Sequence, residues 1–426
     1  MFEKHIQKKL ETYVRRYFTA HPEVKLVAVA GSLGKTSTKV AIATVLSQQY
    51  RVRLHEGDRG TSLSVPLAVL GIEHPLRGGL FAWMGVLRAA RRRIHAPADV
   101  DVIVQELGAN YPGVMAHYST YLLPDISVIT AVTSERMDVF STIESVAKEE
   151  LAVAQFSRLA IINRDDIDGR YASYLTNGNL TTYGTSGAAE YRFITEDFNS
   201  EGGHTGLLIA PDSEQPLAVT VQVSGEHSLR PAIAAATVGY KLGMNAAMIV
   251  KGLGQIRPLP GRMNILRGVK QTILIDDTYN SSPLSSASAL QTLYTFQAPQ
   301  RIAVFTSMSD LGLDSKKEHE MLGKLCDPNM LSWVIVVGDE AARYLAPIAK
   351  SQGCQVMVCA NALDAGAFAH KVLEEGAVIL FNGSRDDVYC EEAIKVVLHS
   401  TDDEARLVRQ SVSQLAEKSQ FFSKFV

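Results

Sequence analysis

The sequence predicts an α/β protein: a P-loop, parallel-sheet domain of the ATPase type followed by a smaller, Rossmann-like doubly wound domain. Along most of the 426 residues, short apolar runs rich in β-branched residues alternate with stretches of helical spacing. Repeated units of this kind build mostly parallel sheets with helices on both faces. The segment Arg257-Pro-Leu-Pro-Gly-Arg262 divides the alternation in two, because prolines and glycines interrupt regular elements.

A chain of this length is too long for one core, so we expect separate domains. Apolar residues four apart, from Phe2 to Phe18, predict an amphipathic helix within an N-terminal part at 1–23. The two larger domains are then expected at 24–260 and 261–426.

Within the first domain we expect a strand from Val24, and we expect further parallel strands at Val100–Gln105, Ile126–Thr133 and Leu159–Asn163. Two strands of antiparallel type are expected at Thr205–Ile209 and Leu217–Val223, before helices at His227–Leu242 and Ala246–Leu253. The second domain repeats the alternation and ends in an amphipathic helix over Asp402–Lys424. Its strands are expected at Thr272–Asp276, Ile302–Thr306, Val334–Val337, Val356–Cys359 and Val378–Phe381.

Composition narrows the class of protein. The formal net charge of −3 gives no reason to expect nucleic acid as a partner. None of the four cysteines forms a C-x-x-C pair, which argues against a zinc ribbon and fits a reducing cytoplasm. The first residues lack a signal-peptide core, and no apolar run reaches the ~20 residues that cross a bilayer. We therefore expect a cytoplasmic protein.

One stretch has the composition of a basic amphipathic helix. Residues 80–94 combine large apolar side chains, Trp83 among them, with four arginines between 88 and 93. Such a helix could make peripheral contact with an anionic membrane. It could equally be a surface helix that buries its apolar side on the domain, and both interpretations stay open.

A phosphate-binding loop is predicted where the first strand ends. Backbone N–H groups of a glycine turn and the positive end of a helix face an anion, Lys35 adds charge, and the Thr36 hydroxyl can ligate Mg²⁺. The spacing is G-x-x-G-K-T, and an ordinary strand-to-helix turn is the alternative. The strand before it and the helix after it favour a nucleotide site. Its expected members are Gly31, Ser32, Gly34, Lys35, Thr36 and Ser37.

A carboxylate ends the next predicted parallel strand. Ligands of parallel sheets bind at the carboxyl ends of the strands, so Glu106 is placed to share Mg²⁺ with Thr36. The alternative is a glutamate that caps a helix or forms a salt bridge.

Four motifs occur in the order found in the Mur ligases: Gly-Lys-Thr-Ser-Thr38, Glu-Leu-Gly-Ala-Asn110, Pro-Gly-Arg262 and Asp276-Asp-Thr-Tyr-Asn-Ser-Ser-Pro283. Each motif alone could be a turn or a salt bridge, but their shared order is far more specific. From about Val24 to about Val397 the chain resembles this family, and within it the members that add a dipeptide.

The resemblance implies an ATP-dependent carboxylate–amine ligase that uses ATP and Mg²⁺. ATP would phosphorylate the carboxylate of a peptide-bearing acceptor, a cell-wall precursor. A small amine, either an amino acid or a dipeptide of the D-Ala-D-Ala type, would then attack the acyl phosphate. Because this intermediate is anionic, cations must neutralise charge where it develops.

The resemblance also implies residue roles. Those implied for catalysis are Lys35, Glu106, Glu150 and Arg262. Metal ligands would be Thr36, Glu106 and Glu150. Nucleotide contacts beyond the loop would be Asp276, Asp277, Tyr279 and Asn280. Substrate contacts would be Asn110, Arg136, His319, Ser384 and Arg385.

Three features of the sequence depart from the family pattern. The family usually has a UDP-binding domain before the loop, and about 23 residues are too few for one. Arg136 stands where a histidine usually ligates a second metal, and a guanidinium has no lone pair to offer. Glu150 stands in place of a carbamylated lysine, as a shorter carboxylate. Two alternatives therefore stay open: an amide ligase on a lipid-linked or poly-amino-acid acceptor, and a nucleotide-binding subunit of a larger complex.

Overall fold

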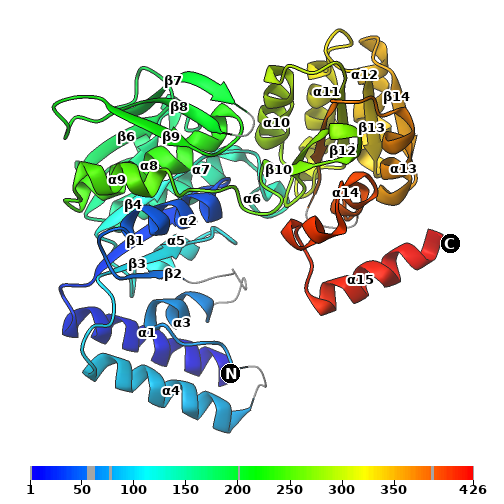
Figure 1. Cartoon of the computed structure of the whole chain (residues 1–426). Helices are drawn as coiled ribbons and strands as arrows, with labels where there is room; N and C mark the ends of the chain where they lie inside the picture. The colour runs from blue at the N-terminus through cyan, green and yellow to red at the C-terminus, as the bar shows by residue number, and fades with distance from the viewer. Residues whose placement is uncertain (1, 55–62, 76–78, 200–201, 385–387, 426) are drawn as a thin grey trace.

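The computed structural model describes residues 2–54, 63–75, 79–199, 202–384 and 388–425. These residues form two α/β domains, each built on one sheet, that follow one another along the chain (Figure 1). The predicted fold class is confirmed. The sheets lie on either side of the predicted boundary at residue 260, and the exact domain limits stay a prediction.

In the described part of the chain, the first sheet has nine strands in the order β2-β3-β1-β4-β5-β6-β7-β8-β9. Neighbours from β2 to β7 are parallel, and β7, β8 and β9 are antiparallel. The strands are β1 (Lys25–Ala30), β2 (Val52–Leu54), β3 (Val102–Glu106), β4 (Ile126–Ile129), β5 (Leu159–Asn163), β6 (Leu180–Gly184), β7 (Tyr191–Asn199), β8 (Gly203–Ile209) and β9 (Leu217–Val221).

Helices cover both faces of this sheet. Successive residues of a strand point to opposite faces, so the apolar residues of β1 need a cover on each side. Leu26 and Ala28 pack in the core under α1, α3, α4, α5 and α7, and Val27 and Val29 pack under α2, α8 and α9. The helices are α1 (Phe2–Ala20), α2 (Lys35–Leu46), α3 (Ser64–Leu70), α4 (Leu80–His95), α5 (Val114–Tyr118), α6 (Met137–Phe140), α7 (Ile143–Leu151), α8 (Arg230–Lys241) and α9 (Ala246–Leu253).

The basic helix α4 packs on α1 at one end of the molecule (Figure 1). Its apolar side chains Trp83, Val86, Ala90 and Ile94 are buried in the core that α1 also joins. This burial favours the surface-helix interpretation over membrane contact. No helix among the described residues is long and apolar enough to cross a membrane.

The second sheet has six strands within the described residues, in the order β10-β11-β15-β12-β13-β14. All neighbours are parallel except the edge strand β10, which is antiparallel to β11. The strands are β10 (Asn264–Arg267), β11 (Ile273–Asp277), β12 (Arg301–Thr306), β13 (Trp333–Val337), β14 (Val356–Cys359) and β15 (Val378–Asn382). Helices cover both faces. They are α10 (Pro283–Thr295), α11 (Ser315–Leu325), α12 (Ala346–Ser351), α13 (Ala362–Val372), α14 (Glu391–Val397) and α15 (Val412–Phe422).

The predicted closing helix over 402–424 is wrong in its extent. A 3₁₀ helix at Thr401–Arg406 and α15 are separate elements, because Leu407 and Val408 turn inward and are buried between them. Arg409 then adopts a left-handed backbone (φ 56°), which helices do not continue through. A capping box at Ser411 starts α15.

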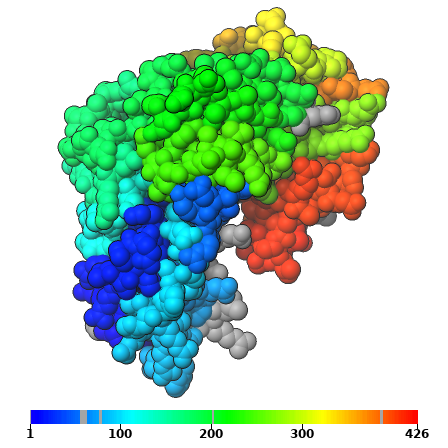
Figure 2. Space-filling model, turned by 60° about the vertical axis from the view of Figure 1, so that its left-hand side comes forward, coloured from blue at the N-terminus to red at the C-terminus, as the bar shows by residue number. Residues whose placement is uncertain are grey.

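Seen as a surface, the α1–α4 pair and the C-terminal segment form two separate projections with a hollow between them (Figure 2). The two domains also touch directly. The Met137 N–H, where α6 begins, donates to the Asp310 carbonyl of the second domain (3.0 Å), and Phe198 lies edge-on to Phe296 (5.7 Å between centroids). The turn between β1 and α2 lies near the second domain as well, because its Gly34 and Asn280 of the second domain line one cavity.

Candidate active site

The phosphate loop joins β1 to α2 and depends on two glycines with positive φ. Gly31 (φ 121°) lies so close to the chain after β4 that a Cβ would collide with the Thr130 hydroxyl and lie 2.8 Å from Ala131 N. Gly34 (φ 80°) is the N-cap of α2. Only glycine adopts both backbones without strain, and the turn directs the N-terminus of α2 toward the loop.

Lys35 folds back over this loop. Its Nζ donates to the carbonyl oxygens of Gly31 (2.6 Å) and Ser32 (2.9 Å), so the ammonium lies where an anion on the loop would be neutralised. Ser32 is itself fixed, because its hydroxyl accepts the N–H of Thr133 (3.2 Å). Ser37, two residues after Lys35 on α2, lines the adjacent cavity.

Thr36 and Glu106 meet although 70 residues separate them in the sequence. The Thr36 hydroxyl donates to Glu106 Oε2 (3.1 Å), because β3 pairs with β1 and places Glu106 beside Val29. A hydroxyl and a carboxylate side by side next to a phosphate loop fit Mg²⁺, which takes few protein ligands and completes its shell with water and phosphate oxygens. Lys39 Nζ lies 3.4 Å from the same carboxylate oxygen and holds it in place.

Glu150, on α7, contacts the phosphate loop. Its Oε2 accepts the N–H of Gly31 at 2.7 Å, a contact that the sequence did not predict. Burial raises the pKa of Glu150 to about 7, although Lys35 and the Gly31 N–H act in the opposite direction. The carboxyl group therefore titrates near neutral pH.

The surroundings of Glu150 do not fit a second metal ion. Glu135 lies near it, with Lys35 and Arg136 as the cations around Glu135. The described residues contain no group of three histidine, cysteine or carboxylate side chains that could hold a metal. The assignment of Glu150 as a metal ligand stays a prediction.

Arg136 lies at the contact between the domains. It has a left-handed backbone (φ 55°) as the N-cap of α6, a conformation that costs a non-glycine residue energy and often marks functional sites. Burial raises the pKa of the neighbouring Glu135, while Lys35, Arg136 and Arg262 lower it. The charges of these three cations thus oppose the effects of burial and of the Asp310 carboxylate on the pKa of Glu135.

The hinge carries Arg262, whose guanidinium lies 4.1 Å from the centre of the Tyr279 ring. This is within the range of a cation–π contact. Asp276 ties the hinge to β11, because it accepts the N–H of Gly261 (2.9 Å) and the hydroxyl of Thr278 (2.6 Å). Burial raises the pKa of Asp276 to about 6. Its oxygens thus face the hinge and its own loop, so direct nucleotide contact stays a prediction.

A cavity of about 140 Å³ lies between the loop and the second domain. Asp277 and Asn280 line it from the second domain, and His227 and Arg230 from the first. Asp277 accepts a hydrogen bond from Asn382 (2.8 Å), and burial raises its pKa to about 7. Burial lowers the pKa of His227 to about 4, helped by the charge of Arg230. A partly apolar pocket beside a phosphate loop, with Arg230, Arg257 and Arg262 in its lining, fits a nucleotide.

The expected substrate contacts are not gathered in one place. His319 is fully buried, and both its ring nitrogens are engaged within the fold, with Met308 N–H (2.9 Å) and the Ser315 carbonyl (2.8 Å). The His319 ring therefore has no free nitrogen for a substrate in this structure. It supports the Met308–Ser309 loop instead. The Ser384 hydroxyl hydrogen-bonds to that of Ser309, so the two side chains lie together. Asn110 lies over Gly108 after β3, and Arg385 is outside the described residues.

Several residues of the site carry no recognisable sequence signal. Thr130 supports the loop through Ala30 and Leu33 carbonyls, and Lys39 holds Glu106. His227 and Arg230 fall on the predicted helix at 227–242 and were not predicted as site residues. Only Lys39, one turn after Thr36 on the same helix face, could have been found from spacing.

Comparison with known proteins identifies two matching family models. The model described as the Mur ligase middle domain matches residues 29–239. The model described as the Mur ligase glutamate ligase domain matches residues 261–385. Together they span both sheets and every described residue of the site.

Two curated relatives carry the name UDP-N-acetylmuramoyl-tripeptide–D-alanyl-D-alanine ligase. That of Escherichia coli is 24% identical over 337 residues, covering 78% of this chain and 68% of the relative. That of Bacillus subtilis is 24% identical over 387 residues, covering 88% and 76%. The crystal structure of MurF ligase from Thermotoga maritima in complex with ADP shares the fold, with a TM-score of 0.74 at 22% identity over 92% of this chain and 83% of that chain.

Proposed function

The chain belongs to the Mur ligase family and is an ATP-dependent, ADP-forming ligase, and we propose that it joins D-alanyl-D-alanine to a UDP-linked muramoyl tripeptide. The names of the relatives support these substrates. The single observation that carries the proposal is a phosphate loop, bearing Lys35 and the Thr36–Glu106 pair, beside a cavity that both domains line. Gly34 and Ser37 of the loop and Arg262 of the hinge are among the residues that line this cavity.

In the first step, an oxygen of the acceptor carboxylate attacks the γ-phosphorus of ATP, and ADP leaves. Lys35 places its ammonium beside the loop N–H groups, where the transferred phosphoryl group carries its charge. Thr36 and Glu106 would hold a Mg²⁺ ion, which neutralises phosphate charge when bound. Arg262, on the hinge, brings a further cation toward the cavity.

In the second step, the amine attacks the acyl carbon, and the C–O bond to phosphate breaks. The products are the amide and inorganic phosphate, with one proton released from the amine. Because an acyl phosphate hydrolyses in water, the two domains must enclose it. The contact between Met137 and Asp310 and that between Phe198 and Phe296 already join the domains.

The alternatives of a lipid-linked or poly-amino-acid acceptor, and of a subunit without ligase activity, are not favoured. Relatives that cover more than 70% of this chain are named as ligases of a UDP-linked muramoyl peptide. Four apolar side chains of α4, the helix that had suggested a lipid surface, are buried against the first domain: Trp83, Val86, Ala90 and Ile94.

An ADP-release assay tests the proposal. The purified chain is incubated with ATP, UDP-linked muramoyl tripeptide and either D-alanyl-D-alanine or single amino acids. We expect continued ADP release only when acceptor and dipeptide are both present, with the amide product seen by mass. Acceptor without dipeptide should give at most one ADP per enzyme, because turnover then stops at the acyl phosphate. ADP formed without an acceptor, or only with a lipid-linked acceptor, would contradict the proposal.

Replacing Thr36 with valine tests the metal ligand. Valine keeps the shape and removes the hydroxyl, so we expect the half-saturating Mg²⁺ concentration to rise roughly 10-fold, measured from ADP release against Mg²⁺. Ser47→Ala, at the other end of α2, removes a hydroxyl that bonds only to the Ala43 carbonyl and is expected to leave this value unchanged. An unchanged Mg²⁺ requirement in Thr36→Val would exclude Thr36 as a ligand.

A further inference from the structure

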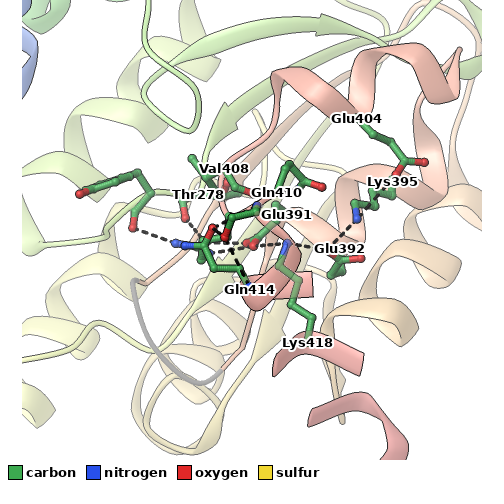
Figure 3. Close-up of polar contacts among 12 residues, drawn as sticks. Thr278, Glu391, Glu392, Lys395, Glu404, Val408, Gln410, Gln414 and Lys418 are labelled. Carbon is green, nitrogen blue, oxygen red and sulfur yellow. Dashed lines mark hydrogen bonds and ion pairs between the residues drawn. The ribbon is translucent and has the colours of Figure 1, made fainter. Parts of the chain in front are cut away.

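A cluster of opposite charges is buried between α14 and α15 (Figure 3). Glu391 has no exposed surface and accepts hydrogen bonds from Arg409 Nε (2.7 Å) and Nη2 (2.5 Å), while Lys418 Nζ lies 2.8 Å from it. Burial opposes ionisation, but these two cations hold the pKa of Glu391 below its usual value. Lys418 also donates to Glu392 (2.7 Å). The cluster is fully paired, as a buried charge requires.

Arg409 differs from Lys418 in what else it touches. Its Nη2 donates to the Thr278 carbonyl (2.7 Å), and its Nη1 donates to the Tyr279 carbonyl (3.3 Å). Thr278 and Tyr279 belong to the loop after β11, between Asp277 at the end of the strand and Asn280, both of which line the nucleotide cavity. One guanidinium therefore links a buried carboxylate to the backbone of the active-site loop.

The same loop is held against the hinge. The Tyr279 N–H donates to the Gly261 carbonyl (2.9 Å). Gly261 has so little room that a Cβ there would lie 2.6 Å from Val408 Cγ1 and 2.8 Å from Tyr279 N. The C-terminal segment thus packs against hinge and loop together, and the Tyr279 ring supports Arg262 from below.

We propose that Arg409 is a positioning residue of the nucleotide site. Glu391 fixes its guanidinium, the guanidinium fixes the carbonyls of Thr278 and Tyr279, and Tyr279 fixes Arg262. This support comes from beyond residue 385, where the match to the family model ends. The inference rests on the proposed function in that Arg262 and the loop act on ATP.

The chemistry explains why this position needs arginine. A guanidinium has five N–H donors in a fixed plane, so it pairs with a carboxylate along one edge and still donates to carbonyls from the other. A lysine at 409 would keep a positive charge for Glu391 but has no planar fork to reach two carbonyls. Arg409→Lys therefore keeps the ion pair with Glu391 and removes the paired hydrogen bonds to the loop carbonyls.

The experiment compares Arg409→Lys with Lys418→Met in the full chain. Both residues contact Glu391, but only Arg409 reaches the loop. We expect Arg409→Lys to raise the KM for ATP and to lower kcat/KM on the order of 10-fold, with a small change in Tm. Lys418→Met should lower Tm and leave kcat/KM within about 2-fold. Unchanged kcat/KM in Arg409→Lys, or the same loss in both variants, would overturn the proposal.

Direct ATP binding by calorimetry separates this inference from the proposed function. A wild type that binds ATP but forms no amide contradicts the function alone, and Arg409→Lys is then still expected to bind ATP on the order of 10-fold more weakly. If Arg409→Lys does not fold, Glu391→Gln takes its place. It removes the charge that anchors Arg409, and it must weaken ATP binding for the proposal to stand.

Discussion

Replacing Lys35 with methionine is expected to lower kcat for ADP formation by about 100- to 1,000-fold. Methionine keeps an unbranched chain of similar length but removes the ammonium that donates to the Gly31 and Ser32 carbonyls of the loop. Negative charge that develops on the transferred phosphoryl group then loses its point-charge partner. Steady-state ADP release with saturating acceptor and dipeptide measures the effect.

Lys25→Met is the matched control for this variant. Lys25 begins β1, at the end of the strand opposite the loop, and its ammonium lies 3.6 Å from Asp125 at the surface. Its loss should leave kcat within about 2-fold, since surface ion pairs contribute little. If the two variants lose equal activity, or Lys35→Met retains full activity, Lys35 has no special role in charge neutralisation.

The parts of the site that the sequence predicted are those formed by residues close together in the chain or by the ends of neighbouring parallel strands. The loop from Gly31 to Ser37 combines strand, glycines and helix within a few residues, and the structure has each element in place. Glu106 was predicted because parallel strands end at one edge of a sheet, and its bond to Thr36 is present. Local sequence and sheet topology were sufficient for these contacts.

The parts that the sequence did not predict depend on contacts between distant segments. The edge strand β10 pairs antiparallel with β11, although nothing in its four residues sets its direction. Arg409 reaches Thr278 across 131 positions, from a turn that interrupts an expected helix. His319 lay at a family-like spacing, but its ring is used inside the fold. For Arg409 and His319, the direction of the side chain and not the position of the residue in the sequence decided the contact.

Replacing Glu150 with glutamine is expected to affect stability and activity in opposite directions. The pKa of Glu150 is raised from 4.5 to about 7, mainly by burial, so the folded protein holds this proton more tightly than the unfolded chain does. Wild-type stability therefore falls as pH rises from about 4.5 through 7. Glutamine has no such titration and can still accept the Gly31 N–H.

The stability difference can be measured by urea unfolding without nucleotide or magnesium. If the whole difference between the two pKa values acts on stability, the glutamine variant gains up to about 3 kcal/mol over wild type at pH 8. At pH 4.5 and below, the two proteins should differ little. A wild type that is more stable than the variant at pH 8 would show that the ionised carboxylate stabilises the fold.

The same substitution should lower kcat by about 10- to 100-fold at pH 8, because it removes a negative charge that lies beside Lys35 and the loop. Glu149→Gln is the matched control one position away: Glu149 accepts the N–H groups of Gly113 (2.8 Å) and Met115 (2.7 Å), where α5 begins. Its loss should cost stability and leave kcat unchanged. We therefore expect Glu150→Gln to raise stability and lower activity, and Glu149→Gln to lower stability and leave activity unchanged. This pair of results would show that the protein keeps a buried carboxylate at position 150 for catalysis, at a cost in stability. If Glu150→Gln is as active as wild type, the carboxylate has no such role.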